Sequence, residues 1–342
     1  MSELLRVTDL TKRFPISKDA FVGAVNGISF ELGAGETLGL VGESGSGKTT
    51  TGRCILRIIE PTSGSIIFDG VDITTQGDEA LRRMRSKMQL VFQEPLASLN
   101  PRRTVSATLE EPLVLEGELS KRERRERVLE TLKLVGLDST SLGLYPAQLT
   151  SSEAQRIGVG RALVTRPKLV VLDEPTSALD STVRAALLDV LQGIQAELGT
   201  SFLFISHDLT AVRRISHRVA IMYLGRLVEI APTEELFAQQ SHPYSRALLS
   251  AVLPVDPRAP LDPFVVEGEI PSAVNPKDEC PFYSRCPLRT EECLEHFPGY
   301  VDVGENHRTA CIHSSDLASK SNTELAAGRA NRSAGLGVLG GA

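Results

Sequence analysis

Gly42-Glu43-Ser44-Gly45-Ser46-Gly47-Lys48-Thr49-Thr50 is the stretch that decides the fold of this 342-residue chain. It follows an apolar run at Thr37–Val41 and precedes a segment from Thr51 that fits a helix. This order, with the spacing G-x-x-x-x-G-K-[ST], is typical of a P-loop, whose glycines let backbone N–H groups surround phosphate oxygens at a helix N-terminus. We expect Lys48 to reach the β- and γ-phosphates and the hydroxyl of Thr49 to hold Mg²⁺. The stretch predicts binding of a nucleoside triphosphate and leaves the use of that nucleotide open.

The composition is that of an ordinary globular protein, with 41% hydrophobic and 23% charged residues. The formal net charge of −6 argues against a chain whose main task is to bind nucleic acid, so we expect no nucleic-acid partner. The longest apolar runs, near Leu169–Leu172 and Phe202–Ile205, have the length of strands and are too short to cross a bilayer. Met1–Arg6 does not resemble the start of a signal peptide. We therefore expect a cytoplasmic protein that reaches a membrane only through partners.

The hydrophobic pattern predicts an α/β fold. Residues 3–40 alternate apolar and polar positions, which predicts short antiparallel strands. Leu169–Glu174 and Phe202–His207 are apolar until their last residues, as in a parallel sheet covered by helices on both faces. Residues 102–165 are helical in character, and we interpret the charged run at 121–127 as a solvated helix face.

Four polar side chains follow predicted strands, where reactive groups of a parallel sheet converge on a ligand. Asp173 and Glu174 end one strand, His207 ends another, and Gln93 follows a third. Hydrolysis of a β–γ phosphate bond needs Mg²⁺, a positioned water and neutralised charge. We assign Asp173 to the Mg²⁺ shell, Glu174 to the general base, Gln93 to the metal or the water, and His207 to the γ-phosphate. Each residue alone also fits a structural role, such as a helix cap or a structural histidine.

One aromatic residue is a candidate for the base of the nucleotide. Phe14 lies in a predicted turn upstream of the P-loop, where its ring could stack on a base. A core or edge position is an equal alternative, and Phe21 is a competitor for the same role.

Taken together, these motifs resemble the nucleotide-binding subunit of an ABC transporter. The matching parts are Gly42–Thr50 as Walker A, Gln93 as Q-loop, Leu169–Glu174 as Walker B, Ser177–Asp180 as D-loop and His207 as the switch histidine. Further stretches narrow the resemblance to the oligopeptide/dipeptide importer ATPases, namely Val91–Pro95 with Ser98–Pro101, His242–Leu249, and Gly268–Ser272 with Asn275-Pro276. The resemblance covers nearly the whole chain up to the tail.

The resemblance implies a P-loop ATPase with a mostly parallel core sheet, an N-terminal antiparallel β subdomain and an α-helical subdomain. We expect the nucleotide-binding domain at residues 1–253, with its helical subdomain at about 94–165. Residues 254–313, rich in proline and then in cysteine, predict an irregular extension. Residues 314–342 are rich in serine, alanine and glycine and predict a disordered tail.

One motif departs from the family. Where the resemblance predicts Leu-Ser-Gly-Gly-Gln, the chain has Leu149-Thr150-Ser151-Ser152-Glu153, which we name the signature segment. In the family this segment faces the ATP held by the P-loop of a second subunit. Thr150 keeps a hydroxyl, but Ser151 and Ser152 add Cβ atoms and Glu153 brings a negative charge toward an anion. The segment therefore predicts weaker phosphate binding, unless neighbours compensate, since serine still donates hydrogen bonds.

Four cysteines near the C-terminus predict a metal centre. Cys280, Cys286, Cys293 and Cys311 lie within a short irregular region, where a metal can replace a missing core. The spacing alone leaves zinc and a [4Fe–4S] cluster equally open, because paired C-x₂-C knuckles are absent while four thiolates suit either. The resemblance favours the [4Fe–4S] cluster, with Zn²⁺ as the alternative, in a structural role. Surface disulfides are the weakest interpretation, and Cys54 fits a buried small hydrophobe.

The sequence thus predicts an ATPase subunit that uses ATP and Mg²⁺ to energise an importer of peptides or related small solutes. The resemblance implies two transmembrane permease subunits, an extracytoplasmic solute-binding protein, and a position on the cytoplasmic face of the bacterial inner membrane. The altered signature segment favours an asymmetric heterodimer with a second ABC ATPase. The alternatives are a chiefly regulatory nucleotide-binding subunit and a soluble ABC ATPase not tied to transport. The transported solute is not legible in the sequence.

Overall fold

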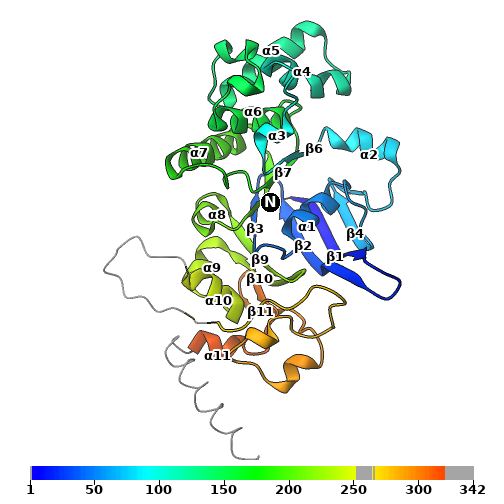
Figure 1. The fold of residues 1–342 in the computed structure, drawn as a ribbon, viewed down its shortest axis with the longest axis vertical. Helices are drawn as coiled ribbons and strands as arrows, with labels where there is room; N and C mark the ends of the chain where they lie inside the picture. The colour runs from blue at the N-terminus through cyan, green and yellow to red at the C-terminus, as the bar shows by residue number, and fades with distance from the viewer. Residues whose placement is uncertain (1, 252–263, 265, 320–342) are drawn as a thin grey trace, which may run out of the picture. The chain divides into compact units, whose positions relative to one another are not determined.

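The computed structural model describes residues 2–251, 264 and 266–319 (Figure 1). They divide into two compact units. Unit 1 holds Met1–Lys12, Gly27–Val41 and Lys48–His217, and unit 2 holds Arg13–Asn26, Gly42–Gly47 and the chain from Arg218 onward. We describe the two units separately.

The core of unit 1 is a parallel sheet, as predicted. Its strands lie in the order β3 (Thr37–Val41), β8 (Ser201–Ser206), β7 (Leu169–Asp173) and β6 (Met88–Val91). Every residue of β3, β7 and β8 is buried, which explains the unbroken apolar runs of the sequence. Helices α1 (Lys48–Ile55) and α8 (Leu209–Ile215) pack on these strands, and α7 (Ser181–Leu198) packs on α8. The α/β fold predicted from the sequence is confirmed.

A second sheet contains the N-terminal strands. The order is β2 (Phe21–Gly33), β1 (Glu3–Pro15), β4 (Ser63–Phe68) and β5 (Val71–Asp72). β1 and β4 are antiparallel, with Leu5 opposite Phe68. The strands β1 and β2 are longer than expected, and Thr37–Val41, which we grouped with them, instead joins the parallel sheet.

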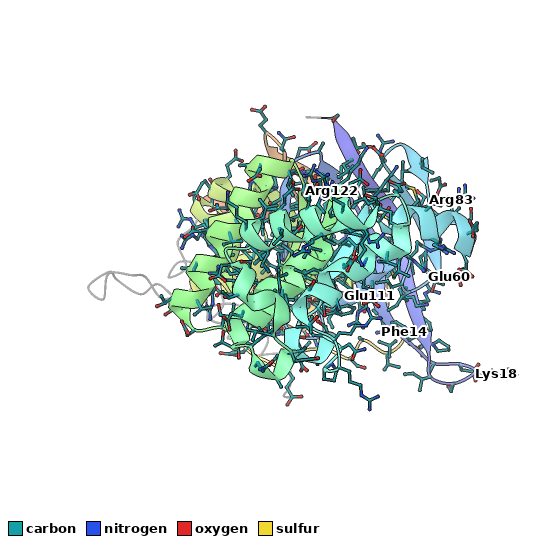
Figure 2. All side chains as sticks on the ribbon, turned by 90° about the horizontal axis from the view of Figure 1, so that it is seen from above. Phe14, Lys18, Glu60, Arg83, Glu111 and Arg122 are labelled. Carbon is teal, nitrogen blue, oxygen red and sulfur yellow. The ribbon has the colours of Figure 1, made fainter. Side chains whose placement is uncertain are left out.

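The helical part of unit 1 includes α2 (Asp78–Arg85), α3 (Pro95–Ser98), α4 (Val105–Glu116), α5 (Lys121–Leu134), two short 3₁₀ turns (Ser139–Gly143 and Pro146–Gln148) and α6 (Ser151–Leu163). Figure 1 shows α4, α5 and α6 side by side, and Leu109, Leu132 and Ile157 belong to one buried cluster among them. The charged run of α5 faces solvent, where Arg122 pairs with Glu126 at 2.9 Å (Figure 2). This run is a solvated helix face, as we interpreted it.

Unit 2 contains an antiparallel arrangement in the order β11 (Val301–Gly304), β12 (His307–Thr309), β10 (Arg226–Pro232) and β9 (Arg218–Tyr223). Its helices are α9 (Thr233–Ala238), α10 (Pro243–Ser250), two 3₁₀ turns (Tyr283–Arg285 and Glu291–Leu294) and α11 (Ser314–Ser319). Glu229 of β10 is fully buried, and its carboxylate accepts hydrogen bonds from the backbone of Ser241 and His242 and contacts His307. This buried charge is therefore satisfied.

The C-terminal part is more ordered than its composition suggests. Two strands lie within the extension expected to be irregular, and Ser314–Ser319 form α11 where we expected the tail to begin. Leu317 is buried, and its carbonyl accepts a hydrogen bond from Arg246 at 3.1 Å, which holds α11 in place. The rest of the expected tail, 320–342, and the start of the expected extension, 254–263, lie outside the described residues.

The predicted metal centre is wrong. Cys280, Cys286, Cys293 and Cys311 line a single cavity, but the described residues contain no group of three or more His, Cys, Asp or Glu side chains that could hold a metal ion. Burial raises the pKa of Cys280 to about 11 and that of Cys286 to about 12. The cysteines are free, so the disulfide interpretation fails as well. Spacing predicted that the four residues converge, but not that they pack as small hydrophobic side chains.

Candidate nucleotide site

The first part of the P-loop requires glycine at two positions. A Cβ atom at Gly42 would lie 2.1 Å from the carbonyl oxygen of Met222, and one at Gly47 would lie 2.1 Å from that of Ala24. Gly47 also has a φ of +102°, in the left-handed region that side chains avoid. The carbonyl of Ser46 accepts a hydrogen bond from the N–H of Gly225 at 2.9 Å. The loop is therefore crowded on one side by unit 2 backbone, and only glycine fits there.

The chain enters α1 directly after this loop. Lys48 is the first residue of the helix and is buried, and Thr49 follows it. The hydroxyl of Thr49 donates a 2.8 Å hydrogen bond to Asp173, which ends β7. Burial is the main cause that raises the pKa of the Asp173 carboxyl. Hydroxyl and carboxylate oxygens are the kind of ligand that a hard cation such as Mg²⁺ prefers.

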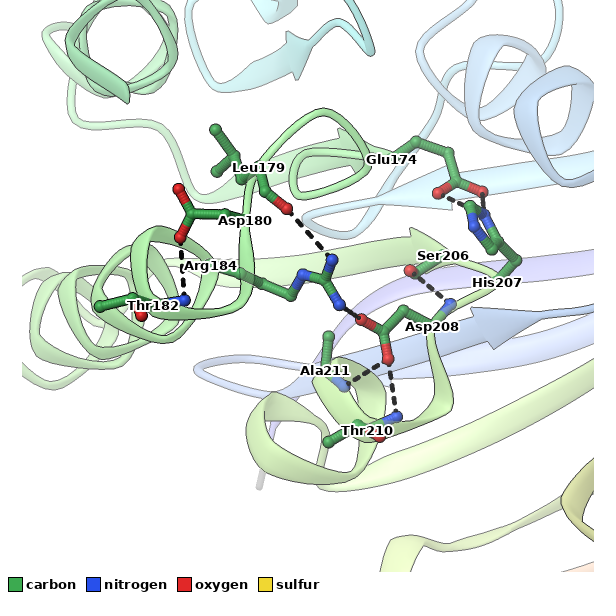
Figure 3. A network of polar contacts seen from close by, with 10 residues as sticks. All are labelled: Glu174, Leu179, Asp180, Thr182, Arg184, Ser206, His207, Asp208, Thr210 and Ala211. Carbon is green, nitrogen blue, oxygen red and sulfur yellow. Dashed lines mark hydrogen bonds and ion pairs between the residues drawn. The ribbon is translucent and has the colours of Figure 1, made fainter. Parts of the chain in front are cut away.

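The second pair of predicted residues also meets. Nδ1 of His207 lies 2.9 Å from each carboxylate oxygen of Glu174 (Figure 3). Glu174 has a φ of +51°, and its N–H donates to the carbonyl of Ile205, so the residue turns sharply at the end of β7. Backbone strain of this kind clusters at functional sites. The side chain of Glu174 is almost buried, while that of His207 is largely exposed.

The sequence did not predict a polar network that lies next to the pair of Glu174 and His207. Arg184 of α7 donates hydrogen bonds to Asp208 and, at 3.1 Å, to the carbonyl of Leu179 (Figure 3). Asp208 also caps α8 through the N–H groups of Thr210 and Ala211. Arg184 therefore ties the segment after His207 to the predicted D-loop. An aspartate just before an apolar helical run is an N-cap signal, but nothing in the sequence pairs it with Arg184.

The remaining predicted residues lie elsewhere. Gln93 is exposed and follows β6 by two residues, at the sheet edge where β7 also ends, because Val91 pairs with Leu172. Phe14 lies on β1, not in a turn, toward the tip of the hairpin that carries Lys18 (Figure 2). The competitor Phe21 packs under the guanidinium of Arg13 at 4.7 Å.

The signature segment leads into α6, and two of its residues, Thr150 and Glu153, hydrogen-bond to each other. The hydroxyl of Thr150 accepts from the N–H of Glu153, and the carboxylate of Glu153 accepts from the N–H and the hydroxyl of Thr150, both at 2.8 Å. This is a capping box, and its hydrogen bonds lower the pKa of Glu153. Ser151 is exposed and Ser152 half-buried. Glu153 therefore carries its negative charge at the helix N-terminus.

Comparison with known proteins decides the family. Residues 25–177 match the ABC transporter family, and residues 228–293 match the C-terminal region of oligopeptide/dipeptide transporters. The oligopeptide transport ATP-binding protein of Bacillus subtilis is 43% identical over 90% of this chain and 96% of that protein. The chain belongs to the ATP-binding proteins of ABC transporters. This ABC ATPase also resembles the dipeptide transport ATP-binding protein of Haemophilus influenzae, at 42% identity over 91% of the chain and 96% of that protein.

Solved structures support the same conclusion. A dimeric ATP-binding cassette bound to ADP and phosphate in a post-hydrolysis state is 28% identical, with a TM-score of 0.62, covering 67% of this ABC ATPase and 99% of that cassette. As a member of this family, the ABC ATPase binds ATP and hydrolyses it to ADP and phosphate. None of the helices in the described part of the chain is long and apolar enough to span a bilayer.

Proposed function

We propose that this ABC ATPase energises a peptide importer, with two permease subunits and a solute-binding protein as partners. The observation that carries the proposal is the meeting of Thr49 with Asp173 and of Glu174 with His207 at the ends of neighbouring strands, in a chain that matches the oligopeptide/dipeptide transporter C-terminal region. Relatives named for oligopeptide and dipeptide transport support peptides as the solute. We assign residues 1–253 to the nucleotide-binding domain and 254–313 to the transporter-type extension.

The P-loop residues bind the phosphates in this proposal. They are Gly42, Ser44, Gly45, Ser46, Gly47, Lys48, Thr49 and Thr50. Thr49, Asp173 and Gln93 would hold Mg²⁺, which when bound would neutralise charge on the phosphate oxygens. Phe14 stacks on the base.

Glu174 acts as the general base. Its carboxylate takes a proton from water while the water oxygen forms a bond to the γ-phosphorus and the bond to the β–γ bridging oxygen breaks, which releases ADP. His207, 2.9 Å from Glu174, orients this carboxylate and then contacts the γ-phosphate. The strained backbone of Glu174 holds the base at the end of β7.

Docking to the permeases uses the helical part of unit 1 in this proposal. Phe92 and Leu96, near Gln93, and Val114 and Leu115, at the end of α4, are large apolar side chains exposed to solvent. Such side chains favour contact with a partner protein. The ABC ATPase would then sit peripherally on the cytoplasmic face of the membrane.

The partner ATPase is a different chain in this proposal, and the two sites are unequal. The site formed by Lys48, Glu174 and His207 with the partner's signature hydrolyses ATP. The site that uses Ser151, Ser152 and Glu153 binds ATP and turns it over slowly, because Glu153 adds a negative charge beside the triphosphate.

The test compares one substitution in each subunit of the reconstituted importer. Glu174→Gln removes the proton acceptor and should reduce transport-coupled ATPase activity by about a thousandfold. The equivalent substitution in the partner should cost less than about twofold. Equal losses from the two substitutions would overturn the asymmetric assignment, and full activity of Glu174→Gln would overturn the role of the base.

A further inference from the structure

Glu43, the second residue of the P-loop stretch, is held by two residues more than two hundred positions further along the chain. Its N–H donates a 3.0 Å hydrogen bond to the hydroxyl of Tyr244. Both of its carboxylate oxygens lie 3.3 Å from Nη1 of Arg285. All three residues belong to unit 2, and Tyr244 and Arg285 lie within the stretch that matches the oligopeptide/dipeptide transporter region.

The surroundings of this contact are aromatic and buried. Arg285 also donates to the hydroxyl of Tyr223 at 3.3 Å, and the ring of Tyr223 packs against Tyr244 at 4.5 Å and edge-on against Phe282 at 5.4 Å. Tyr223, Tyr244 and Phe282 are fully buried. The side chains of Arg285 and Glu43 are 15% and 31% exposed, so solvent screens their interaction less than that of a fully exposed pair.

Each partner of Glu43 is itself fixed by local structure. Tyr244 is near the start of α10, where its N–H donates to Nδ1 of the buried His242 at 3.0 Å. Arg285 ends a 3₁₀ turn whose backbone hydrogen bonds run from Arg285 to Phe282 and from Tyr283 to Cys280. Both contacts therefore bring hydrogen-bonded parts of the C-terminal region to the P-loop.

We propose that Tyr244 and Arg285 are positioning residues that brace the P-loop, so that the C-terminal region sets the affinity of the nucleotide site for ATP. This inference rests on the proposed binding of phosphates by the P-loop. Tyr244 fixes the backbone at Glu43, and Arg285 neutralises a carboxylate that would otherwise repel a triphosphate from the adjacent loop. The brace is the set Glu43, Tyr244 and Arg285.

The charge argument predicts a specific change in the KM for ATP if the brace is correct. Arg285→Gln removes the positive charge that contacts the Glu43 carboxylate and should raise the KM for ATP about fivefold while kcat changes by less than about twofold. Glu43→Gln removes the repelling charge, so the double variant should return KM to within about twofold of the unmodified protein. A purely structural role of Arg285 would not be rescued in this way.

The experiment measures KM and kcat for ATP in the reconstituted complex, and ATP affinity of the purified full chain by calorimetry. The matched control is Arg289→Gln, four residues further on, because Arg289 is exposed and donates to the carbonyl of Ser284. Arg285→Lys, which keeps the charge, should leave KM within about twofold and covers the case in which Arg285→Gln does not fold. Tyr244→Phe should raise KM about threefold by removing the acceptor for the N–H of Glu43.

Arg285→Gln behaving like Arg289→Gln, or no rescue by Glu43→Gln, would overturn the brace. Lys48→Ala separates this failure from failure of the proposed site. If Lys48→Ala abolishes ATP binding while Arg285→Gln does nothing, only the brace is wrong. If Lys48→Ala leaves ATP binding intact, the assignment of the P-loop is itself wrong, and the brace falls with it.

Discussion

The P-loop and the signature segment both lie at the start of a helix and were both expected to meet ATP phosphates, but the structure holds them differently. At Gly42 and Gly47 a Cβ atom would collide with backbone carbonyl oxygens. At the start of α6, Ser151 is exposed and Ser152 half-buried, and the segment is closed by its own capping box. Glycine is dictated by crowding within the chain in the first case. In the second case the chain itself accommodates serine. Serine would weaken binding only at the nucleotide of the proposed partner.

The largest effect that we expect is a loss of ATP affinity after substitution in the P-loop. Gly47→Ala combines a φ of +102° with a Cβ placed 2.1 Å from the carbonyl oxygen of Ala24. The loop must shift, so we expect ATP affinity to fall by about a hundredfold in calorimetry. Gly45→Ala is the control, since no heavy atom of the described residues lies within 4 Å of its Cβ, although its φ is +79°. A similar loss in both variants would show that strain, not crowding, governs the loop.

The next largest effect concerns ATPase activity after substitutions in the signature segment. Ser151→Gly combined with Ser152→Gly removes the two Cβ atoms that we propose keep backbone N–H groups from the partner's ATP. We expect the ATPase activity of the proposed heterodimer, once reconstituted, to rise by up to about tenfold. Ser314→Gly with Ser315→Gly, at the first two residues of α11, controls for the loss of helix propensity. Unchanged activity would mean that the serines donate as well as glycine N–H groups do.

A pH dependence belongs to the P-loop side, through His242, which accepts a hydrogen bond from the N–H of Tyr244. Burial lowers the pKa of His242 from 6.5 to about 3. Below pH 6.5 the unfolded chain binds a proton that the folded chain does not, so the free energy of unfolding falls by about 1.4 kcal/mol per pH unit as pH drops. The stability that the folded chain has with His242 buried and neutral is therefore fully present above pH 6.5 and is lost as pH falls below it.

His242→Asn is the matched variant, because asparagine keeps an acceptor at the N-cap but does not titrate. Denaturant unfolding at pH 6.5 and 5.5 should show the steeper loss in the unmodified chain only. Equal slopes in the two proteins would show that His242 is protonated in the folded chain.

The smallest effect tests the charge of the signature segment. Glu153→Gln keeps an acceptor for the N–H and hydroxyl of Thr150 and removes the negative charge, so we expect ATPase activity of the proposed heterodimer to rise about threefold. The control is Glu123→Gln, which makes the same change in the Ser120–Glu123 capping box of α5. If both substitutions change activity equally, the effect comes from helix capping and not from the nucleotide.

Local patterns predicted much of the nucleotide site. The parallel strands and the placement of Asp173, Glu174 and His207 at their ends follow from apolar runs that stop at polar residues. The pairing of Arg184 with Asp208 could not be predicted, because a side-chain ion pair between two helices leaves no periodic signal. Phe14 was assigned to a turn because proline and glycine follow it, whereas pairing extends β1 to Pro15.

The sequence by itself determined the P-loop and the α/β core, because spacing along a chain fixes which groups meet when a loop joins a strand to a helix. The resemblance of its motifs to known proteins indicated the family. The cysteines show the limit of an argument from spacing. Their spacing correctly predicted that they lie together, since they line one cavity, but it wrongly predicted a metal centre. Only the tertiary structure decided why Gly42 and Gly47 must be glycine, and what holds Glu43. Those answers depend on atoms of Met222, Ala24, Tyr244 and Arg285, which are remote in the chain and come into contact only when unit 2 folds.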